Sequence, residues 1–277
     1  MQPEVIDTHT HVVSADHVRY PLSPGVDSEQ GWHREHPVDT ETLLAQAEAA
    51  GVQSLALVQA ISCYGFDNRY VLDSARDHPQ RTIAVGGLRP DDPDPVAALR
   101  RDVIDGGARG VRLFSVGGTT APLDHPAMRA VMATAVDLDI PVVMLTAPGQ
   151  LASVFAVANA FPSGRFVLDH CGFADLGGDD SFPHADALFA LAQSGNLHLK
   201  VSSMTLRATS HPEALWATLV SRFGSERLMW GSDYPHTNEP SYAALVALAL
   251  ETTAALTEGA RVNVLAGTAR RLWPELG

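Results

Sequence analysis

Short apolar runs alternate along the chain with longer stretches whose apolar residues recur at helical spacing. The short runs are rich in Val, Ile and Leu and do not alternate polar with apolar positions, which is typical of parallel strands buried on both faces. We predict eight strands from this pattern, at residues 5–7, 54–59, 82–87, 110–114, 141–145, 165–169, 197–201 and 228–231.

Helical stretches lie between these runs, at residues 40–50, 68–77, 94–105, 127–138, 149–160, 185–193, 213–223 and 242–250, with a last helix at 261–273. Thr40 is the expected N-cap of the first helix and Gly51 its end. Eight strands that alternate with helices favour one α/β domain over residues 1–277, a single (β/α)8 TIM barrel. The alternation alone also allows an open, doubly wound sheet. Residues 14–38 are expected as an insertion over the catalytic face, because they follow the first strand.

Composition narrows the classes of partner. The net charge is −13, which argues against a nucleic acid or an anionic membrane as partner. The two cysteines, Cys63 and Cys171, cannot build a disulfide framework, and the N-terminus resembles no secretion signal. We therefore expect a cytoplasmic protein with reduced thiols. Nothing in the pattern specifies an oligomeric state, and a homo-oligomer is compatible with it.

Two histidines follow the first apolar run, in the sequence Asp7-Thr8-His9-Thr10-His11. Side chains alternate along a strand, so His9 and His11 share one face at the strand's carboxyl end. Two imidazoles placed in this way can ligate one metal ion or hold one substrate carbonyl group.

Two further strands deliver polar residues to the same rim. His170 follows the run at 166–168, and Asp233 follows the run at 228–231. Barrel enzymes place their catalytic groups at the carboxyl ends of strands. Asp233 is suited to metal ligation or to accepting a proton from an attacking water. The convergence of three strands predicts an active site made by His9, His11, His170 and Asp233.

These motifs together resemble the amidohydrolase superfamily, and within it the TIM-barrel lactonase branch. The resemblance rests on the HxH pair, the Asp169-His170-x-Gly172 motif and the Gly231-Ser232-Asp233-x-Pro235 motif, and weaker matches at 19–21, 64–70, 109–112 and 200–202 extend it along the chain. It implies hydrolysis of a cyclic ester, with the aspartate activating water and the histidines polarising the carbonyl group.

The metal question stays open at this stage. Metal-dependent amidohydrolases usually add a Lys, Glu or His from strand four or five, whereas the fifth predicted strand here ends in Leu145-Thr146. His9, His11 and Asp233, with His170 as a possible fourth ligand, would suit Zn²⁺ or another divalent ion. Without metal, protonated histidines would stabilise the oxyanion while Asp233 deprotonates water.

Substrate contacts are expected from residues near the rim. Arg112 is the candidate for binding a carboxylate, and a small carboxylated or polyhydroxylated lactone is the expected substrate. Lys200 lies inside an apolar run and needs an anionic partner, for which Asp233, Asp169 and the substrate are the candidates. Tyr64, Asn68, Arg207 and His236 are further candidates. The alternative function is a metal-dependent decarboxylase of aromatic or muconate-type acids, although Thr146 stands where such enzymes usually have a histidine ligand.

Overall fold

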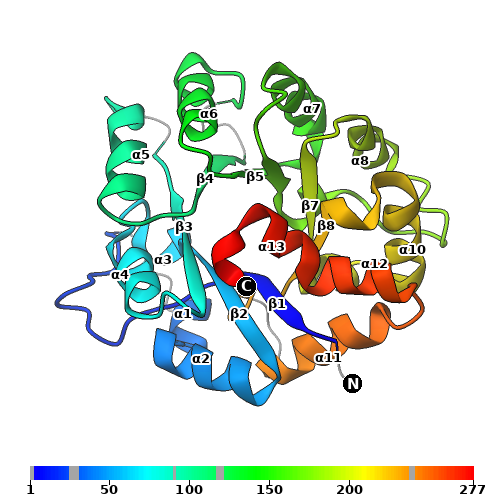
Figure 1. The fold of residues 1–277 in the computed structure, drawn as a ribbon, viewed down its shortest axis with the longest axis horizontal. Helices are drawn as coiled ribbons and strands as arrows, with labels where there is room; N and C mark the ends of the chain where they lie inside the picture. The colour runs from blue at the N-terminus through cyan, green and yellow to red at the C-terminus, as the bar shows by residue number, and fades with distance from the viewer. Residues whose placement is uncertain (1–2, 25–30, 90–91, 117–121, 237–240) are drawn as a thin grey trace.

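Eight parallel strands form one sheet in the order β1 to β8 in the computed structural model, which describes residues 3–24, 31–89, 92–116, 122–236 and 241–277. Backbone hydrogen bonds between the ends of β1 and β8 bring the two edges together: Asp233 N donates to His9 O, and His11 N donates to Tyr234 O. The strands therefore form the (β/α)8 barrel expected from the sequence (Figure 1). They are β1 Val5–Thr10, β2 Val52–Val58, β3 Thr82–Gly87, β4 Gly110–Ser115, β5 Val142–Thr146, β6 Phe166–Leu168, β7 Leu197–Ser202 and β8 Leu228–Gly231.

Helices surround the strands on the outside (Figure 1). Those that cover the barrel are α2 Thr40–Ala49, α4 Arg69–Asp77, α5 Pro95–Ile104, α6 Pro126–Asp137, α7 Leu151–Ala160, α8 Asp186–Ala190, α10 Pro212–Phe223 and α11 Tyr242–Thr252. Short helices lie in the connections and near the C-terminus: α1 Trp32–Glu35, α3 Ile61–Tyr64, α9 Ser203–Arg207, α12 Glu258–Val262 and α13 Thr268–Leu272. The N-cap prediction for α2 was wrong by one residue, because Asp39 accepts the capping hydrogen bond from Thr42 N.

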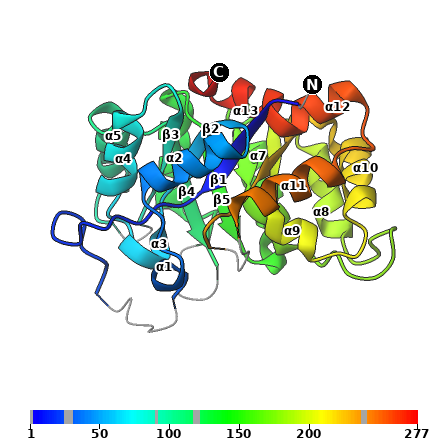
Figure 2. The ribbon, with the colours of Figure 1, turned by 90° about the horizontal axis from the view of Figure 1, so that it is seen from below.

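The interior of the barrel is apolar at one end and charged at the other. Strand side chains such as Ile6, Val85 and Met229 form one buried cluster with Leu272 and Trp273 of the C-terminal segment. The chain termini lie at this end, whereas α1, α3 and α9 lie toward the other end (Figure 2). That other end carries the carboxyl ends of the strands, which is where barrel enzymes place their reactive residues.

No helix in the described part of the chain is long and apolar enough to cross a membrane. The outer helices instead cover the strands, and their buried positions join the strand side chains in the main hydrophobic core.

His198 on β7 makes the stability of the barrel depend on pH. Burial lowers its pKa from 6.5 to about 4, and its Nδ1 lies 3.2 Å from Phe166 O. Between these two pKa values the unfolded chain binds a proton that the folded chain does not. The free energy of unfolding therefore falls as pH drops through this window, by about 2 kcal/mol at pH 5 relative to pH 7. His198→Asn should lose this part of the acid sensitivity, as measured by urea unfolding at both pH values. Equal losses between pH 7 and 5 in both proteins would contradict the prediction.

Candidate active site

The junction of β1 and β8 brings three of the expected residues together. His9 Nε2 lies 3.5 Å from Asp233 Oδ1, and His11 Nε2 lies 3.4 Å from the same oxygen. His11 is oriented by a 2.8 Å hydrogen bond between its Nδ1 and Val58 O. Because Val58 is the last residue of β2, the neighbouring strand fixes the ring that faces the carboxylate.

The glycine that ends β8, Gly231, is required by how closely this strand approaches β1. A Cβ on Gly231 would lie 2.6 Å from His9 Cβ, so no other residue fits without moving the histidine. Asp233 then adopts a left-handed conformation with φ 63°, which aspartate tolerates better than most residues. The glycine and this turn together point the carboxylate at the imidazoles.

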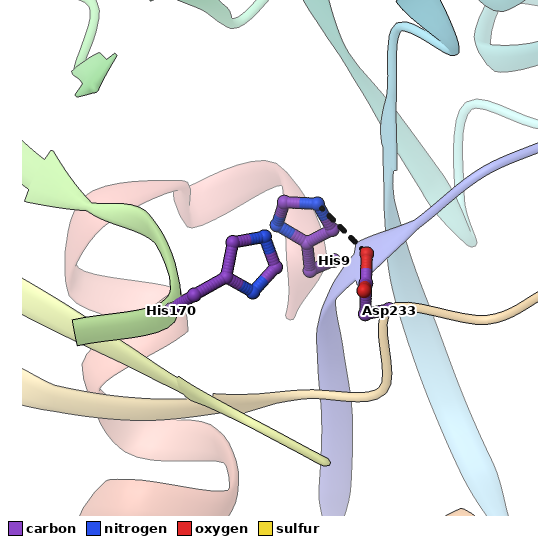
Figure 3. A group of neighbouring side chains, drawn as sticks. All are labelled: His9, His170 and Asp233. Atoms are coloured by element: carbon purple, nitrogen blue, oxygen red, sulfur yellow. Dashed lines mark ion pairs between the residues drawn. The ribbon is translucent and has the colours of Figure 1, made fainter. Parts of the chain in front are cut away.

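His170 reaches the same place from β6 through an unusual backbone. Four consecutive residues, His170, Cys171, Gly172 and Phe173, have φ between 51° and 63°. A left-handed turn is costly for residues with a Cβ, so the surrounding structure must hold it. One restraint is the 2.9 Å hydrogen bond between His170 Nδ1 and Ser202 Oγ at the end of β7. Figure 3 shows His9, His170 and Asp233 gathered at one point, and the rings of His9 and His170 are 4.8 Å apart.

A buried ionic network contacts His9. Asp169 Oδ2 accepts a 2.7 Å hydrogen bond from Arg112 Nε, and Asp169 Oδ1 lies 3.1 Å from Lys200 Nζ. His9 Nδ1 lies 3.3 Å from both Lys200 Nζ and Asp169 Oδ1. Of the two protein partners that the sequence allowed for Lys200, Asp169 is the one that it contacts.

The charges of the site are set by burial and by these contacts. Burial alone would raise the pKa of Asp233, but the contacts from His11 and His236 hold it well below its usual value. Burial lowers the pKa of His9, His11 and His170. The site thus holds an ionised carboxylate among neutral imidazoles near neutral pH. Burial thus disfavours the charged form of these three imidazoles, which the metal-free alternative would require of at least one of them.

The more exposed His236 behaves differently. Its Nδ1 lies 3.3 Å from Asp233 Oδ2, and this contact raises the pKa of the imidazole. Of the four histidines in this group, His236 therefore takes up a proton most readily. Its protonated ring remains in contact with Asp233.

A cavity of about 410 Å³ opens over this group. His11, His170, Asp233, Arg112 and His236 line it. The other proposed substrate contacts are not among its lining residues in the described structure. Tyr64 OH accepts a hydrogen bond from Ser14 N, Asn68 bonds to Gly87 and Asp102, Lys200 is buried in the network, and Arg207 is exposed on α9. Contact of these four residues with substrate stays a prediction.

A set of side chains suited to a metal ion is also present. His9, His170 and Asp233 each offer a ligand atom, and these atoms all lie within 4.8 Å of one another. His9 Nε2 is buried and has no hydrogen-bond partner among the described residues. The carboxylate of Asp169 next to His9 Nδ1 is a typical outer partner of a metal-bound imidazole. Two imidazoles and one carboxylate therefore fit a divalent ion.

Sequence reasoning missed several residues that shape the site. Ser202 orients His170, and Phe173 stacks on the His170 ring with centroids 5.2 Å apart. The apolar residues Ile61 and Met204 line the cavity from α3 and α9. Ile61, Phe173 and Met204 lie in connections that carry no periodic signal, and only their placement after β2, β6 and β7 indicated the rim.

The fold and the site define a class of protein, the (β/α)8-barrel enzymes that gather histidines and an aspartate at the carboxyl ends of their strands. Within this class the chain belongs to the amidohydrolase family, whose model, described as Amidohydrolase, matches residues 6–274.

Known relatives are similar over most of the chain. An L-fucono-1,5-lactonase from Burkholderia ambifaria is 32% identical over 209 residues, which cover 72% of this chain and 69% of the relative. A 2-pyrone-4,6-dicarboxylate hydrolase from Comamonas testosteroni is 25% identical over 248 residues, 84% of this chain and 77% of that protein. A crystal structure from Pseudomonas putida, described as a 2-pyrone-4,6-dicarboxylic acid hydrolase, superposes with a TM-score of 0.77 at 26% identity and covers 99% of each chain.

Proposed function

We propose that this protein is a carboxylic-ester hydrolase that opens a lactone ring. The observation that carries the proposal is the ionised, buried Asp233 carboxylate, which faces His9 and His11 at the bottom of a cavity. Two relatives whose names describe a lactonase and a pyrone dicarboxylate hydrolase support the same chemistry.

Each step of the proposed reaction has its own residue or set of residues. Asp233 accepts a proton from water as the water oxygen bonds to the carbonyl carbon. Neutral His9 and His170 can each carry their proton on Nε2 and donate a hydrogen bond to the carbonyl oxygen, which becomes negatively charged. Neutral His11 carries its proton on Nδ1, where Val58 O accepts it, so its Nε2 can only accept a hydrogen bond. The bond between this carbon and the ring oxygen then breaks, and the proton returns to the ring oxygen from Asp233 directly or through His236. The product is an open-chain hydroxy acid.

A divalent ion, with zinc as the first candidate, would be held by His9, His170 and Asp233, with His11 next to them. Such an ion would polarise the ester carbonyl group and favour the ionisation of water. The metal-bound and the metal-free forms of the site require different tautomers of His9. A proton on Nδ1, shared with Asp169, leaves Nε2 free as a ligand, whereas donation from Lys200 to Nδ1 leaves a proton on Nε2 that can bond to the substrate.

The test of the function is acid release from a panel of lactones by the purified protein, measured with a pH indicator. We expect one acid equivalent per lactone opened and no CO₂ from aromatic acids, because β5 supplies Thr146 rather than an imidazole. CO₂ release without lactone turnover would overturn the proposal in favour of the decarboxylase.

Elemental analysis of the same preparation shows whether the site works with a bound metal ion or without one. About one divalent ion per chain, lost in His170→Asn, assigns His170 as a ligand. Full turnover by ion-free protein assigns the imidazoles as hydrogen-bond donors instead.

A further inference from the structure

Lys200 is a charged side chain that the barrel buries completely. It lies on β7 with 0% of its surface exposed, and an ammonium group in the interior is unfavourable unless its contacts replace the lost water. Its carboxylate partner, Asp169, lies 3.1 Å away but already accepts a 2.7 Å hydrogen bond from Arg112. Two buried cations thus share one carboxylate, and charge balance within this network does not account for the second cation.

The ammonium group of Lys200 also contacts the active site, through His9. Its Nζ lies 3.3 Å from His9 Nδ1 with the geometry of a hydrogen bond. Asp169 Oδ1 lies equally close to the same ring nitrogen, but this oxygen accepts no well-directed hydrogen bond from any described residue. An ammonium group has only donors, so the Nδ1 atom that faces it is the acceptor.

This contact decides which nitrogen of His9 carries the proton. Burial lowers the pKa of His9, so the ring is neutral and holds a single proton. With Nδ1 as the acceptor, that proton is on Nε2, which is buried and has no hydrogen-bond partner among the described residues. In Figure 3 this is the ring nitrogen from which the dashed line runs to Asp233, whose Oδ1 lies 3.5 Å away. In the other tautomer two lone pairs would face each other here without a proton between them.

The other histidine of the pair has the opposite arrangement. His11 donates from Nδ1 to Val58 O, so its Nε2 presents a lone pair 3.4 Å from Asp233 Oδ1. An ammonium group beside one ring and a backbone carbonyl group beside the other therefore set opposite tautomers in the two imidazoles. A water molecule can donate to His11 and Asp233, while His9 is left to donate to the carbonyl oxygen of the ester.

We propose that Lys200 is a positioning residue for lactone opening, because it holds the proton of His9 on Nε2 and thereby keeps this imidazole a hydrogen-bond donor to the oxyanion. The inference rests on the proposed lactone hydrolysis and assigns the group that sets one of its donors. The same contact opposes metal binding, because a ligand nitrogen needs a lone pair. His9 Nε2 gains one only if the proton moves to Nδ1, next to Asp169.

Nitrogen NMR of the ion-free full chain with isotope-labelled histidines tests the tautomer without any lactone. The chemical shifts of the two ring nitrogens show which one carries the proton, and His9→Gln identifies the signals of His9. We expect the His9 proton on Nε2 in the wild type and on Nδ1 in Lys200→Met, where Asp169 remains beside that nitrogen. His198 lies on the same face of β7 but bonds to Phe166 O, so His198→Asn is the control and should leave the His9 signals unchanged.

Kinetics and metal affinity distinguish positioning from a merely structural role. Lys200 is not among the described residues that line the cavity, so Lys200→Met should leave KM nearly unchanged. The kcat of the ion-free variant should fall by about 10²- to 10³-fold, the usual effect of losing one oxyanion donor. Its affinity for Zn²⁺, measured by competition with a chelator, should rise at least about tenfold, because His9 Nε2 then offers a lone pair. An unchanged kcat in a folded variant whose tautomer has reversed would overturn the inference.

The outcomes separate the inference from the function on which it rests. A His9 proton on Nδ1 in the wild type, or the same tautomer in both proteins, rejects the inference, and the wild-type spectrum alone decides this point if Lys200→Met does not fold. Lactone turnover by a chain whose His9 is protonated on Nδ1 leaves the proposed function standing and rejects only the inference. Failure to open any lactone rejects the proposed function and with it the role of Lys200 in catalysis.

Discussion

Asp233→Asn should lower kcat for lactone opening by about 10²- to 10⁴-fold, the range that a general base usually contributes. The amide keeps the shape of the side chain but cannot accept a proton from water. KM should change little, because the amide is similar in size to the carboxylate and the other lining residues stay in place. Initial rates of acid release at saturating lactone measure the effect.

The folded state of this variant is the necessary control. Removing a buried carboxylate from between His9 and His11 should not unfold the barrel, so thermal unfolding followed by circular dichroism is expected to stay close to that of the wild type. A folded Asp233→Asn variant with kcat within about threefold of the wild type would show that another group activates water.

Asp169→Asn should destabilise the protein by roughly 3–5 kcal/mol, the usual effect of removing one partner of a buried ion pair. Arg112 and Lys200 would both stay buried in the barrel without their carboxylate. Urea unfolding measures the change. Asp67→Asn, which removes the partner of Arg69 on the surface, is the matched control and should cost less than about 1 kcal/mol.

A double variant tests whether the buried ion pairs of Asp169 explain the loss of stability in Asp169→Asn. Adding Lys200→Met to Asp169→Asn removes one unpaired cation, so the double variant should recover part of the stability lost in Asp169→Asn alone. If the two substitutions add within about half a kcal/mol, the buried ion pair is not the cause.

The strand pattern predicted the fold well because each strand is buried on both faces. All eight predicted strands are present within a few residues of their expected bounds, and the rim residues His9, His11, His170 and Asp233 meet as the barrel requires. Parallel strands of one barrel carry their carboxyl ends to one side, so residues that follow different strands must converge. Their convergence could therefore be predicted from the topology alone, without knowledge of side-chain contacts.

The residues that contact substrate could not be predicted from the pattern of apolar and polar positions. The distance between Asn68 and the reactive group depends on how α4 packs, and Asn68 bonds instead to Gly87 and Asp102. Lys200 alternates toward the barrel interior, but its depth below the rim depends on the register of β7 against β8. Periodicity gives the face of a strand and not its depth.

The division between strands and connections has a consequence for how this enzyme can diversify. The ionic network is built on strands β4 and β7 and on the residue that follows β6, whereas Ile61, Phe173 and Met204 lie in connections. Substitutions in those connections can change which ring enters while the proton-transfer groups keep their positions. Laboratory evolution toward new lactones should therefore accumulate its first substitutions in α3, in α9 and at Phe173, at little cost to the proton-transfer chemistry.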